Sequence, residues 1–531
     1  MMVPVSALFK EYKQFYDMDV FERVKVDDLP QIAKNKALNA INLIKEKGNG
    51  DIKGRTCANG KMQEKYLNKE ETSSPTVAVE SLFMSLCIDS HEKRDVAIFD
   101  VPSAYLNAYM PDDKFLLIKF DSKFVDIMCE VNPELIEDVR FERGKKVLYL
   151  KIKKALYGCI ESALLWYNLF LNKFTDLGFK VNPYDRCVAN KIIDGQQCTI
   201  VWYVDDVKVS HTNKSVVSDV IKYMQEEFGN ITVSRGNSHT YLGMDIEFLK
   251  NKRISISMKR HIKELLNMLP GGVQGITTSP AKKDMFDVDT KSQALDQKSA
   301  DLFHSIIAKI LWITKRGRPD LETAESFLCT RVANPNEDDW QKLERLLRFV
   351  NSTREDKRII GINDINTMNT FIDASYAVHP NMRGHTGGAI SFGVGIIHGK
   401  ASKQKINVKS STECELVGVS EYIPYSLWLG YFLEHQGYKL KSNLVHQDNQ
   451  SAMRMEVNGR TSCTGNSRHI NIRYFFVKDR VDSGEVKIVY CPTGRMLADY
   501  FTKPLQGNLF KTFRAVIMGW EDISTLDAVN D

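Results

Sequence analysis

The sequence predicts an α+β protein in which mixed strands and helices are followed by a helical stretch and then by a separate α/β unit. Strand and helix patterns alternate up to about Phe248. Apolar residues at helical spacing then dominate in the ranges 257–269, 300–313 and 338–350. After Thr370, apolar strands end in acidic residues and alternate with helices. The length of 531 residues suggests three or more domains.

Composition narrows the class of protein. The hydrophobic content of 43% is ordinary for a globular protein, and no run reaches the roughly 18 apolar residues of a membrane span. The ten cysteines occur singly, without zinc-binding spacing, which favours a reduced intracellular protein. The apolar stretch in residues 1–10 is too short for a signal peptide. We therefore expect no membrane partner and no structural zinc.

The net charge of +5 is mild, so binding to nucleic acid must come from local basic surface. One such surface surrounds the apolar run 147–150. We predict a hairpin there, whose cations either follow a phosphate backbone or form a solvated face. These basic residues are Arg140, Arg143, Lys145, Lys146, Lys151, Lys153 and Lys154.

Two adjacent carboxylates, Asp205 and Asp206, follow the apolar run 199–202. The pattern predicts a strand, a tight turn and a second strand, with both aspartates at the tip of the hairpin. Carboxylates presented rigidly in this way suit two Mg²⁺ ions, which is the chemistry of a nucleotidyl transferase. Asp-Asp is also common in ordinary turns, because aspartate bonds to its own backbone. Other residues must therefore decide.

Asp100 is the best candidate for a third metal-binding carboxylate. It follows the apolar run 97–99 and precedes a short turn and a helix start, so we expect it at a strand end beside the hairpin tip. Tyr105, five residues later, is placed where an aromatic ring could close under the sugar of an incoming nucleotide. A bulky ring there would clash with a 2′-hydroxyl. The alternative is a core tyrosine.

Short blocks along the chain share one order with a known family. They are residues 53–60, 71–75, 100–107, 154–158, 203–206, 241–246, 318–320, 410–415 and 498–505. In this order the blocks resemble the reverse transcriptase and ribonuclease H region of the polyproteins of copia-type (Ty1/copia) LTR retrotransposons. Each block is weak alone, but the ordered set is highly specific.

The resemblance implies an α+β right-hand polymerase with fingers, palm and thumb and a helical connection, followed by an α/β ribonuclease H-like domain with a mixed five-stranded sheet. We expect fingers and palm in residues 1–250, thumb and connection in 251–365, and the ribonuclease H-like domain in 366–531. The polar stretch 281–299 is predicted as a loop and the stretch 351–370 as a linker.

Within this framework, residues 241–244 resemble the turn that holds the primer. The alternative for them is an ordinary strand with a glycine bulge.

The same resemblance implies contacts with the incoming nucleotide. Lys53 and Arg55 lie where finger strands carry cations towards the triphosphate, although isolated residues of this kind are more often plain surface charges. Tyr157 and Gly158 should approach the nucleotide by close backbone packing, which glycine permits. Residues 159–164 then depart from the family pattern, with the loss of two basic residues and a proline, which removes expected template contacts.

A second set of acidic residues follows the order strand, helix, strand, helix: Asp373, Glu415, Asp448 and Asp499. This is the order of ribonuclease H, where four carboxylates hold two Mg²⁺ ions that activate water and stabilise the leaving 3′-oxygen. Glu413 competes with Glu415, which would also complete a capping box with Thr412. We choose Glu415 because it matches the family's second glutamate. His469 matches a family motif, but a packing or helix-ending role is expected.

The predicted function is an RNA-directed DNA polymerase joined to a ribonuclease H, with two Mg²⁺ ions per site and Mn²⁺ as the substitute. Expected partners are an RNA template, a DNA primer, deoxynucleoside triphosphates, the RNA/DNA hybrid, held through phosphates and 2′-hydroxyls, and an integrase region of the same polyprotein. The chain is expected to be the C-terminal part of such a polyprotein or a gene model cut from one. Its expected location is the cytoplasm, in virus-like particles, with entry into the nucleus. The alternative is a catalytically silent transposon remnant that only binds nucleic acid.

Overall fold

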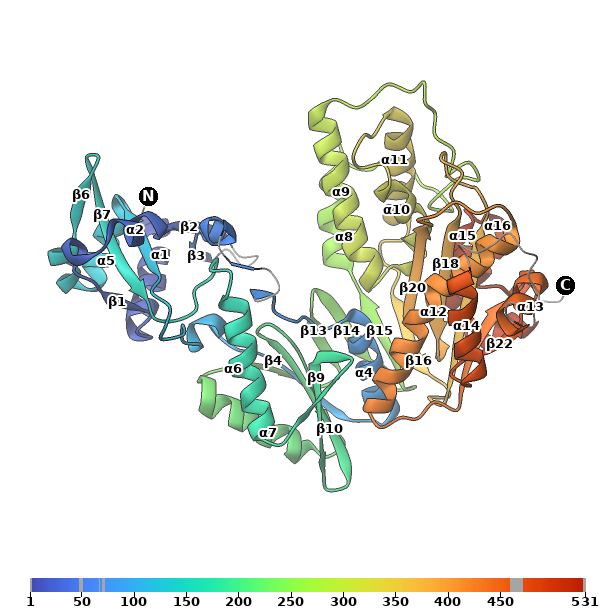
Figure 1. Cartoon of the computed structure of the whole chain (residues 1–531), viewed down its shortest axis with the longest axis horizontal. Coiled ribbons are helices and arrows are strands. Elements are labelled where there is room, and N and C mark those ends of the chain that lie inside the picture. The colour runs from blue at the N-terminus through green and yellow to red at the C-terminus, as the bar shows by residue number, and fades with distance from the viewer. Residues whose placement is uncertain (1, 47–50, 66, 69–71, 459–470, 529–531) are drawn as a thin grey trace.

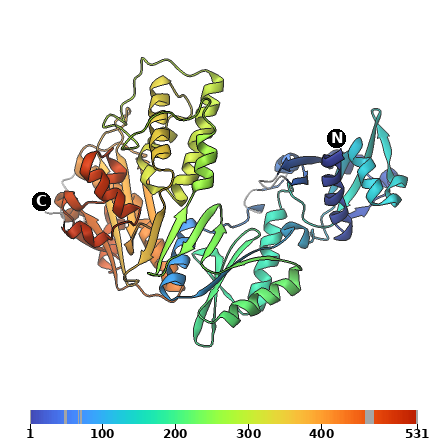
Figure 2. The same cartoon turned by 180° about the vertical axis from the view of Figure 1, so that it is seen from behind.

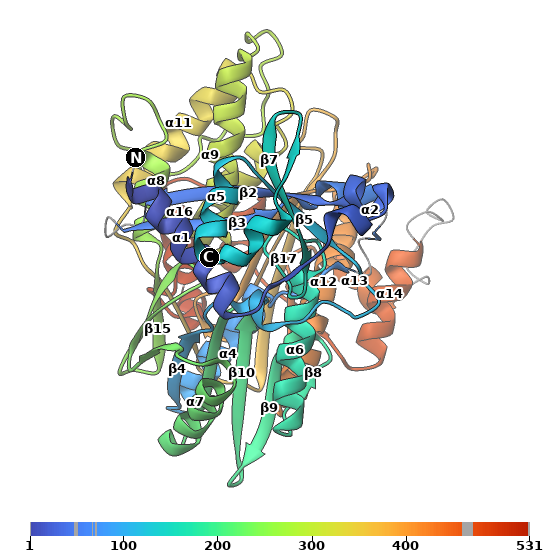
Figure 3. The same cartoon turned by 90° about the vertical axis from the view of Figure 1, so that its left-hand side faces the viewer.

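The computed structural model describes residues 2–46, 51–65, 67–68, 72–458 and 471–528. Within these residues, four β-sheets with their covering helices organise the chain (Figure 1). The view from behind shows the same arrangement (Figure 2), and the side view looks along the long axis with the N-terminal lobe facing the viewer (Figure 3). None of the helices in these ranges has both the length and the apolar character needed to cross a bilayer.

The first sheet and its helices form a lobe at one end of the molecule, with the strand order β1-β7-β5-β2-β3 and β6 paired to β7 (Figure 1). Its elements are α1 (Met2–Asp17), β1 (Phe21–Arg23), α2 (Gln31–Lys36), β2 (Leu38–Glu46), β3 (Ile52–Ala58), β5 (Leu117–Asp121), α5 (Lys123–Val131), β6 (Arg140–Glu142) and β7 (Lys145–Ile152). The lobe has its own hydrophobic cluster, in which Tyr12 and Phe21 pack against Phe120. It corresponds to the expected fingers.

The second sheet corresponds to the expected palm and has the strand order β12-β4-β11-β10-β9-β8. Its elements are α4 (Val79–His91), β4 (Asp95–Asp100), the 3-10 turn η3 (Ala104–Asn107), α6 (Ser162–Asp176), β8 (Lys180–Asn182), β9 (Asp185–Ile193), β10 (Gln196–Tyr203), β11 (Asp206–His211), α7 (Lys214–Phe228) and β12 (Thr232–Arg235). Helices α6 and α7 pack together where Trp166 and Phe170 meet Phe228. Because Phe170 also contacts Trp202 of β10, these helices fix the central strands.

A third sheet, ordered β13-β14-β15-β16-β19, links the palm to a group of helices. Its elements and helices are β13 (Ser238–Tyr241), β14 (Met244–Phe248), β15 (Arg253–Ser257), α8 (Lys259–Leu266), α9 (Gln297–Arg316), α10 (Glu322–Cys329), α11 (Glu337–Ser352), β16 (Arg358–Ile362) and β19 (Gly393–Val394). Helices α8, α9 and α11 confirm the three predicted helical ranges. A capping box between Asn336 and Asp339 starts α11.

The prediction of a linker in residues 351–370 is wrong. The segment contains the end of α11, all of β16 and the start of the next strand. Strand β16 pairs with β15 on one side and with β19 on the other, so it belongs to a sheet. The segment 351–370 is mostly polar and charged, and only Ile359, Ile360 and Ile362 give β16 an apolar pattern. The sequence therefore did not indicate a strand there.

The fourth sheet is the predicted mixed five-stranded sheet, with the order β20-β18-β17-β21-β22. Strand β17 pairs parallel with β21 and antiparallel with β18, and β21 pairs parallel with β22. Its elements are β17 (Thr367–Ser375), β18 (His385–Ser391), β20 (His398–Lys403), α12 (Ser411–His435), β21 (Ser442–Gln447), α13 (Gln450–Asn458), α14 (Asn471–Asp482), β22 (Lys487–Tyr490), α15 (Asp499–Thr502) and α16 (Gly507–Ile517). Helix α12 makes the crossover that two parallel strands require.

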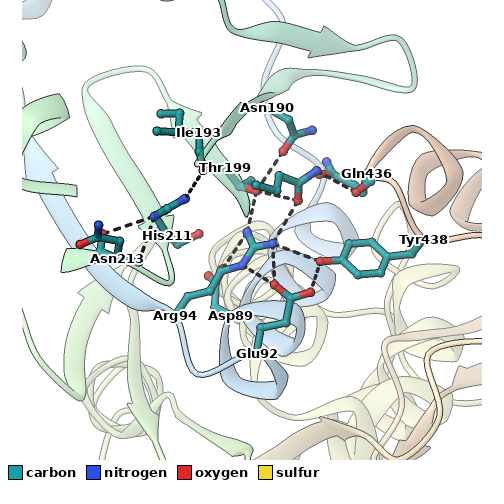
Figure 4. A network of polar contacts seen from close by, with 12 residues as sticks. Asp89, Glu92, Arg94, Asn190, Ile193, Thr199, His211, Asn213, Gln436 and Tyr438 are labelled. Atoms are coloured by element: carbon teal, nitrogen blue, oxygen red, sulfur yellow. Dashed lines mark hydrogen bonds and ion pairs between the residues drawn. The ribbon is translucent and has the colours of Figure 1, made fainter. Parts of the chain in front are cut away.

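Palm and C-terminal domain share one continuous hydrophobic cluster, whereas the fingers have a separate one. A polar network also joins the two (Figure 4). The Arg94 guanidinium, buried just after α4, donates to Thr199 at 2.9 Å and to the Tyr438 hydroxyl at 3.1 Å. Gln197 donates to the backbone oxygen of Gln436 at 2.8 Å. The second and fourth sheets are therefore held in one orientation.

The predicted basic hairpin exists as β6 and β7, but most of its cations have acidic partners within the fingers. The ion pairs are Arg140 with Asp27, Lys146 with Asp126, Lys151 with Glu22 and Lys153 with Asp19. Because acidic partners neutralise these cations, they attract a phosphate backbone only weakly. The structure therefore favours a solvated face over a nucleic-acid contact.

Candidate active sites

The predicted acidic hairpin is formed by β10 and β11, whose end residues Tyr203 and Asp206 are paired across the two strands. We call residues 203–206 the acidic turn. Val204 has a backbone φ of +58°, in the left-handed region. A β-branched residue is rarely found there, and such a conformation costs roughly 1–3 kcal/mol unless the surrounding structure imposes it. The turn that carries the two aspartates is therefore strained.

Asp100 ends β4 beside this turn, in the predicted position. Strand β4 pairs with β11, and Asp100 lies directly opposite Asp206. The backbone N–H of Val101 donates to the backbone oxygen of Asp205 at 3.0 Å, which closes the gap between the two segments. Sheet pairing thus brings together three carboxylates that are up to 106 positions apart in the sequence.

Close carboxylates raise the pKa values of Asp205 and Asp206. Burial, and then the charges of Asp205 and Asp100, raise the pKa of Asp206 to about 6. The pKa of Asp205 is also raised, first by burial and then by Asp100, while Arg55 and Lys53 counteract the shift. Like charges at close range favour protonation or a bound cation. The donor set, with one carboxylate at the end of β4, one in the turn and one at the start of β11, suits Mg²⁺.

A line of side chains connects the fingers to the acidic turn. Lys53 and Arg55 lie exposed on one face of β3, and the Arg55 guanidinium lies 4.4 Å from the centre of the Tyr157 ring. The Tyr157 ring is in turn 4.8 Å from the ring of Tyr105, on η3. Burial, and then the charge of Asp205, raise the pKa of the Tyr105 phenol. Arg55, Tyr157 and Tyr105, all predicted to contact the nucleotide, thus form one row of contacts from β3 to η3.

Gly158 packs closely against the backbone of strand β3. Its φ is +90°, and a Cβ atom there would lie 2.0 Å from the backbone oxygen of Ala58 on β3. The N–H of Ala58 also donates to the backbone oxygen of Tyr157 at 2.7 Å. The glycine is required for this packing, and its contact with a nucleotide stays a prediction. In the divergent segment that follows, the carboxylate of Glu161 pairs with Lys114.

The second acidic set forms a cluster at one end of the fourth sheet. Carboxylate oxygens of Asp373, Glu415 and Asp448 lie within 4.8 Å of one another. They come from β17, from α12 and from the residue after β21, in the predicted order of elements. One buried oxygen, Glu415 Oε2, has no hydrogen-bond partner. An unpaired buried carboxylate oxygen beside two further carboxylates suits a divalent cation.

The structure separates Glu415 from Glu413. Ser410 caps α12, and its hydroxyl accepts the N–H of Glu413 at 3.2 Å. The Glu413 carboxylate is exposed and accepts the N–H of Lys409 at 2.7 Å. Capping at this helix start thus involves Glu413, so the alternative of a capping box between Thr412 and Glu415 is wrong. Glu415 instead belongs to the acidic cluster.

Asp499 opens α15 beside the cluster and brings a cation with it. Burial, and then the charge of Asp373, raise the pKa of Asp499 to about 7. Lys503, one turn further on, places its ammonium 2.7 Å from Asp499 and 3.6 Å from Asp373. Lys503 was not predicted as a site residue, although its four-residue spacing from Asp499 is the signal of a helical ion pair. His469 and residue 71, the first of the block 71–75, lie outside the described residues.

Comparisons with known proteins agree with this geometry. The family model described as "Reverse transcriptase (RNA-dependent DNA polymerase)" matches residues 22–270. The chain is 23% identical over 516 residues to the Retrovirus-related Pol polyprotein from transposon TNT 1-94 of Nicotiana tabacum, covering 94% of this chain and 37% of that protein. It is 22% identical over 533 residues to the Transposon Ty1-MR1 Gag-Pol polyprotein of Saccharomyces cerevisiae, covering 97% and 29%.

A solved foamy viral protease-reverse transcriptase in complex with an RNA/DNA hybrid aligns over 92% of this chain and 63% of that chain, with a TM-score of 0.47 and 11% identity. The present chain spans about a third of the length of the curated relatives it matches.

Fold, acidic turn and family match together define residues 22–270 as a reverse transcriptase domain. Over nearly its whole length the chain is similar to the Pol polyproteins of copia-type retrotransposons.

Proposed function

We propose that this chain copies RNA into DNA at the acidic turn and cuts the RNA strand of the resulting hybrid at the C-terminal cluster. The observation that carries the proposal is the presence of two separate sets of carboxylates. Asp100 lies opposite Asp206 beside the acidic turn of the palm sheet, and a close carboxylate cluster lies on the mixed five-stranded sheet. Each retains every acidic residue that its chemistry needs. A silent remnant, under no selection for catalysis, would have no reason to keep both sets.

At the first site, Asp100, Asp205 and Asp206 would hold two Mg²⁺ ions, with Mn²⁺ as a substitute. Bound ions would supply Lewis acidity to the primer 3′-hydroxyl and to the α-phosphate. Lys53 and Arg55 would neutralise the triphosphate, because they lie on the face of β3 that leads to the turn. The same two cations would neutralise the negative charge that develops on the leaving pyrophosphate.

Tyr105 would discriminate against ribonucleotides at this site. Its ring is fixed against Tyr157 and lies close enough to Asp205 for the charge of that carboxylate to raise its phenol pKa. A ring held there would clash with a 2′-hydroxyl on an incoming sugar. Deoxynucleoside triphosphates are therefore the proposed substrates.

At the second site, Asp373, Glu415, Asp448 and Asp499 would hold the two ions that hydrolysis of RNA requires, with the same Lewis-acid role. Lys503 keeps Asp373 and Asp499 from repelling each other until a cation arrives. The hybrid would be bound through phosphates and 2′-hydroxyls, with little preference for sequence.

The relatives are named as Pol and Gag-Pol polyproteins of transposons, and these names support a polyprotein setting. We propose that the chain works beside an integrase region of the same polyprotein, in cytoplasmic virus-like particles, and that its DNA product then enters the nucleus.

Primer extension tests the polymerase. The folded chain is incubated with an RNA template, a DNA primer, deoxynucleotides and Mg²⁺, beside the variant Asp205→Asn. We expect extension by the wild type and none by the variant. Equal products, or no wild-type product from a folded sample, would leave the silent remnant as the better account.

Cleavage of a preformed RNA/DNA hybrid tests the ribonuclease. Glu415→Gln should abolish cleavage, because it removes a carboxylate from the cluster. Glu413→Gln is the matched control, since it changes a glutamate two residues away that only contacts the backbone at the helix start. Equal loss in both variants would assign the effect to helix α12 and not to the cluster.

A further inference from the structure

Successive carbonyl groups of the acidic turn are held by different parts of the fold. Trp166 on α6 donates its indole N–H to the backbone oxygen of Val204 at 2.6 Å. The N–H of Val101, after β4, donates to the backbone oxygen of Asp205 at 3.0 Å. The first of these bonds comes from a side chain, so a single substitution can remove it.

The third carbonyl is bound by a tyrosine. The hydroxyl of Tyr241, the last residue of β13, lies 3.2 Å from the backbone oxygen of Asp206 and 3.4 Å from that of Val201. Both oxygens are acceptors, so the tyrosine donates its proton between them. Burial raises the phenol pKa well above its usual value, which keeps the donor protonated.

These hydrogen bonds stabilise the turn in its strained conformation. Val204 is left-handed with a φ of +58°, and such a residue keeps its conformation only when its surroundings impose it. Trp166 and Tyr241 are each 1% exposed, so water cannot replace either bond. If the turn relaxed, the side chains of Asp205 and Asp206 would move away from Asp100.

We propose that Trp166 and Tyr241 are positioning residues of the polymerase site, which hold the strained turn so that Asp205 and Asp206 face Asp100. The inference rests on the proposed polymerase function. Neither side chain reaches the metal-binding carboxylates themselves. Each acts through the backbone of the turn, from an element that sequence analysis did not connect with it.

Tyr241→Phe is the sharpest test, because it removes one oxygen atom and keeps the packed ring. Tyr167→Phe is the matched control: Tyr167, also buried in the palm, donates its hydroxyl to the backbone oxygen of Arg186 at 3.0 Å, away from the turn. Measurements are kcat and KM for deoxynucleotide on a primed RNA template, and thermal stability. Mn²⁺ binding is titrated calorimetrically in chains that also carry Asp373→Asn and Asp448→Asn, so that the first site alone reports.

For Tyr241→Phe we expect kcat to fall about tenfold or more, with KM within about twofold of wild type, since misplacing a reacting group by about 1 Å can cost a hundredfold. Mn²⁺ should bind several-fold more weakly. Trp166→Phe should change both quantities in the same direction, and Tyr167→Phe should change neither, although its stability falls similarly.

Wild-type kcat and Mn²⁺ affinity in Tyr241→Phe would overturn the inference, as would equal losses in Tyr167→Phe, which would indicate a general effect of the core. If the wild-type chain makes no DNA, the proposed function fails, and the Mn²⁺ titration still decides whether Tyr241 positions the turn.

Discussion

Asp206 carries much of the electrostatic cost of the first site. Its pKa of about 6 lies above the ordinary value of 3.8, so the folded chain binds this proton more tightly than the unfolded chain does. By linkage, ionising such a group costs stability. In the metal-free chain this cost is absent below about pH 4 and grows as the pH rises through about 6.

Asp206→Asn should therefore stabilise the metal-free chain at pH 7.5, by about 1 kcal/mol once solvent screening of this half-exposed group is allowed for. The difference should disappear near pH 4. Mg²⁺ should raise the melting temperature of the wild type more than that of the variant, and less at pH 5 than at pH 7.5. Thermal melts with and without Mg²⁺ measure this, and a variant less stable than wild type at pH 7.5 would contradict it.

Positions of the acidic residues were predictable where an apolar strand ends in a carboxylate, as at Asp100, or where two strands flank a pair, as at Asp205 and Asp206. The hydrogen bonds from Trp166 and Tyr241 to the turn were not predictable from the sequence. Their partners are backbone oxygens, which every residue possesses, so nothing in the sequence marks which carbonyl a distant donor will reach.

At the scale of elements, α15 begins with the metal-binding candidate Asp499 and is followed directly by its counterion, Lys503. Asp499 and Lys503 lie one turn apart, and the Lys503 ammonium also lies 3.6 Å from Asp373 on β17. Neighbouring carboxylates raise the pKa of Lys503 to about 12 despite its burial. The lysine thus stabilises the acidic cluster in the metal-free chain.

Lys503→Met should destabilise the metal-free chain by about 1–3 kcal/mol, because it leaves two buried carboxylates without a counterion. Mg²⁺ should recover more stability in this variant than in wild type, since a cation then fills the place of the ammonium. Lys511→Met, on exposed surface of α16, is the control and should behave as wild type. Chemical denaturation with and without Mg²⁺ measures the effect, and equal Mg²⁺ stabilisation of all three chains would contradict it.

Elements were predictable where apolar periodicity is long, as in α9 and α11, and where it ends in an acidic residue, as in β17. Strand β16 escaped prediction because its five residues pair with β15 and β19 from distant parts of the chain. Short strands depend on such partners more than on their own sequence.

At the scale of the whole molecule, palm and ribonuclease H-like domain form one body while the fingers form a separate lobe. The Arg94 network and the Trp428 indole, which donates to the backbone oxygen of Tyr184 at 3.0 Å, fix this interface. With the two acidic clusters held at one separation, a hybrid would reach the second site a constant number of base pairs after the first.

Arg94→Met should lower the free energy of unfolding by about 3–5 kcal/mol, because it removes a buried cation from Glu92, Thr199 and Tyr438. Arg235→Met is the matched control. Arg235 pairs with Asp95 in the same palm but is more exposed, so its loss should cost about 1 kcal/mol or less. Urea denaturation compares them, and equal midpoints would show that the interface does not depend on Arg94.

One reaction tests the central claim, that a single chain makes DNA at one site and removes RNA at another. A primed RNA template, with primer and template labelled differently, is incubated with wild type, Asp205→Asn or Glu415→Gln in Mg²⁺ and deoxynucleotides. Wild type should lengthen the primer and shorten the RNA. Asp205→Asn should not lengthen the primer but should still cut the RNA of a preformed hybrid. Glu415→Gln should lengthen the primer but leave the RNA uncut. A folded wild type that does neither, or variants that each lose both activities, would contradict the account.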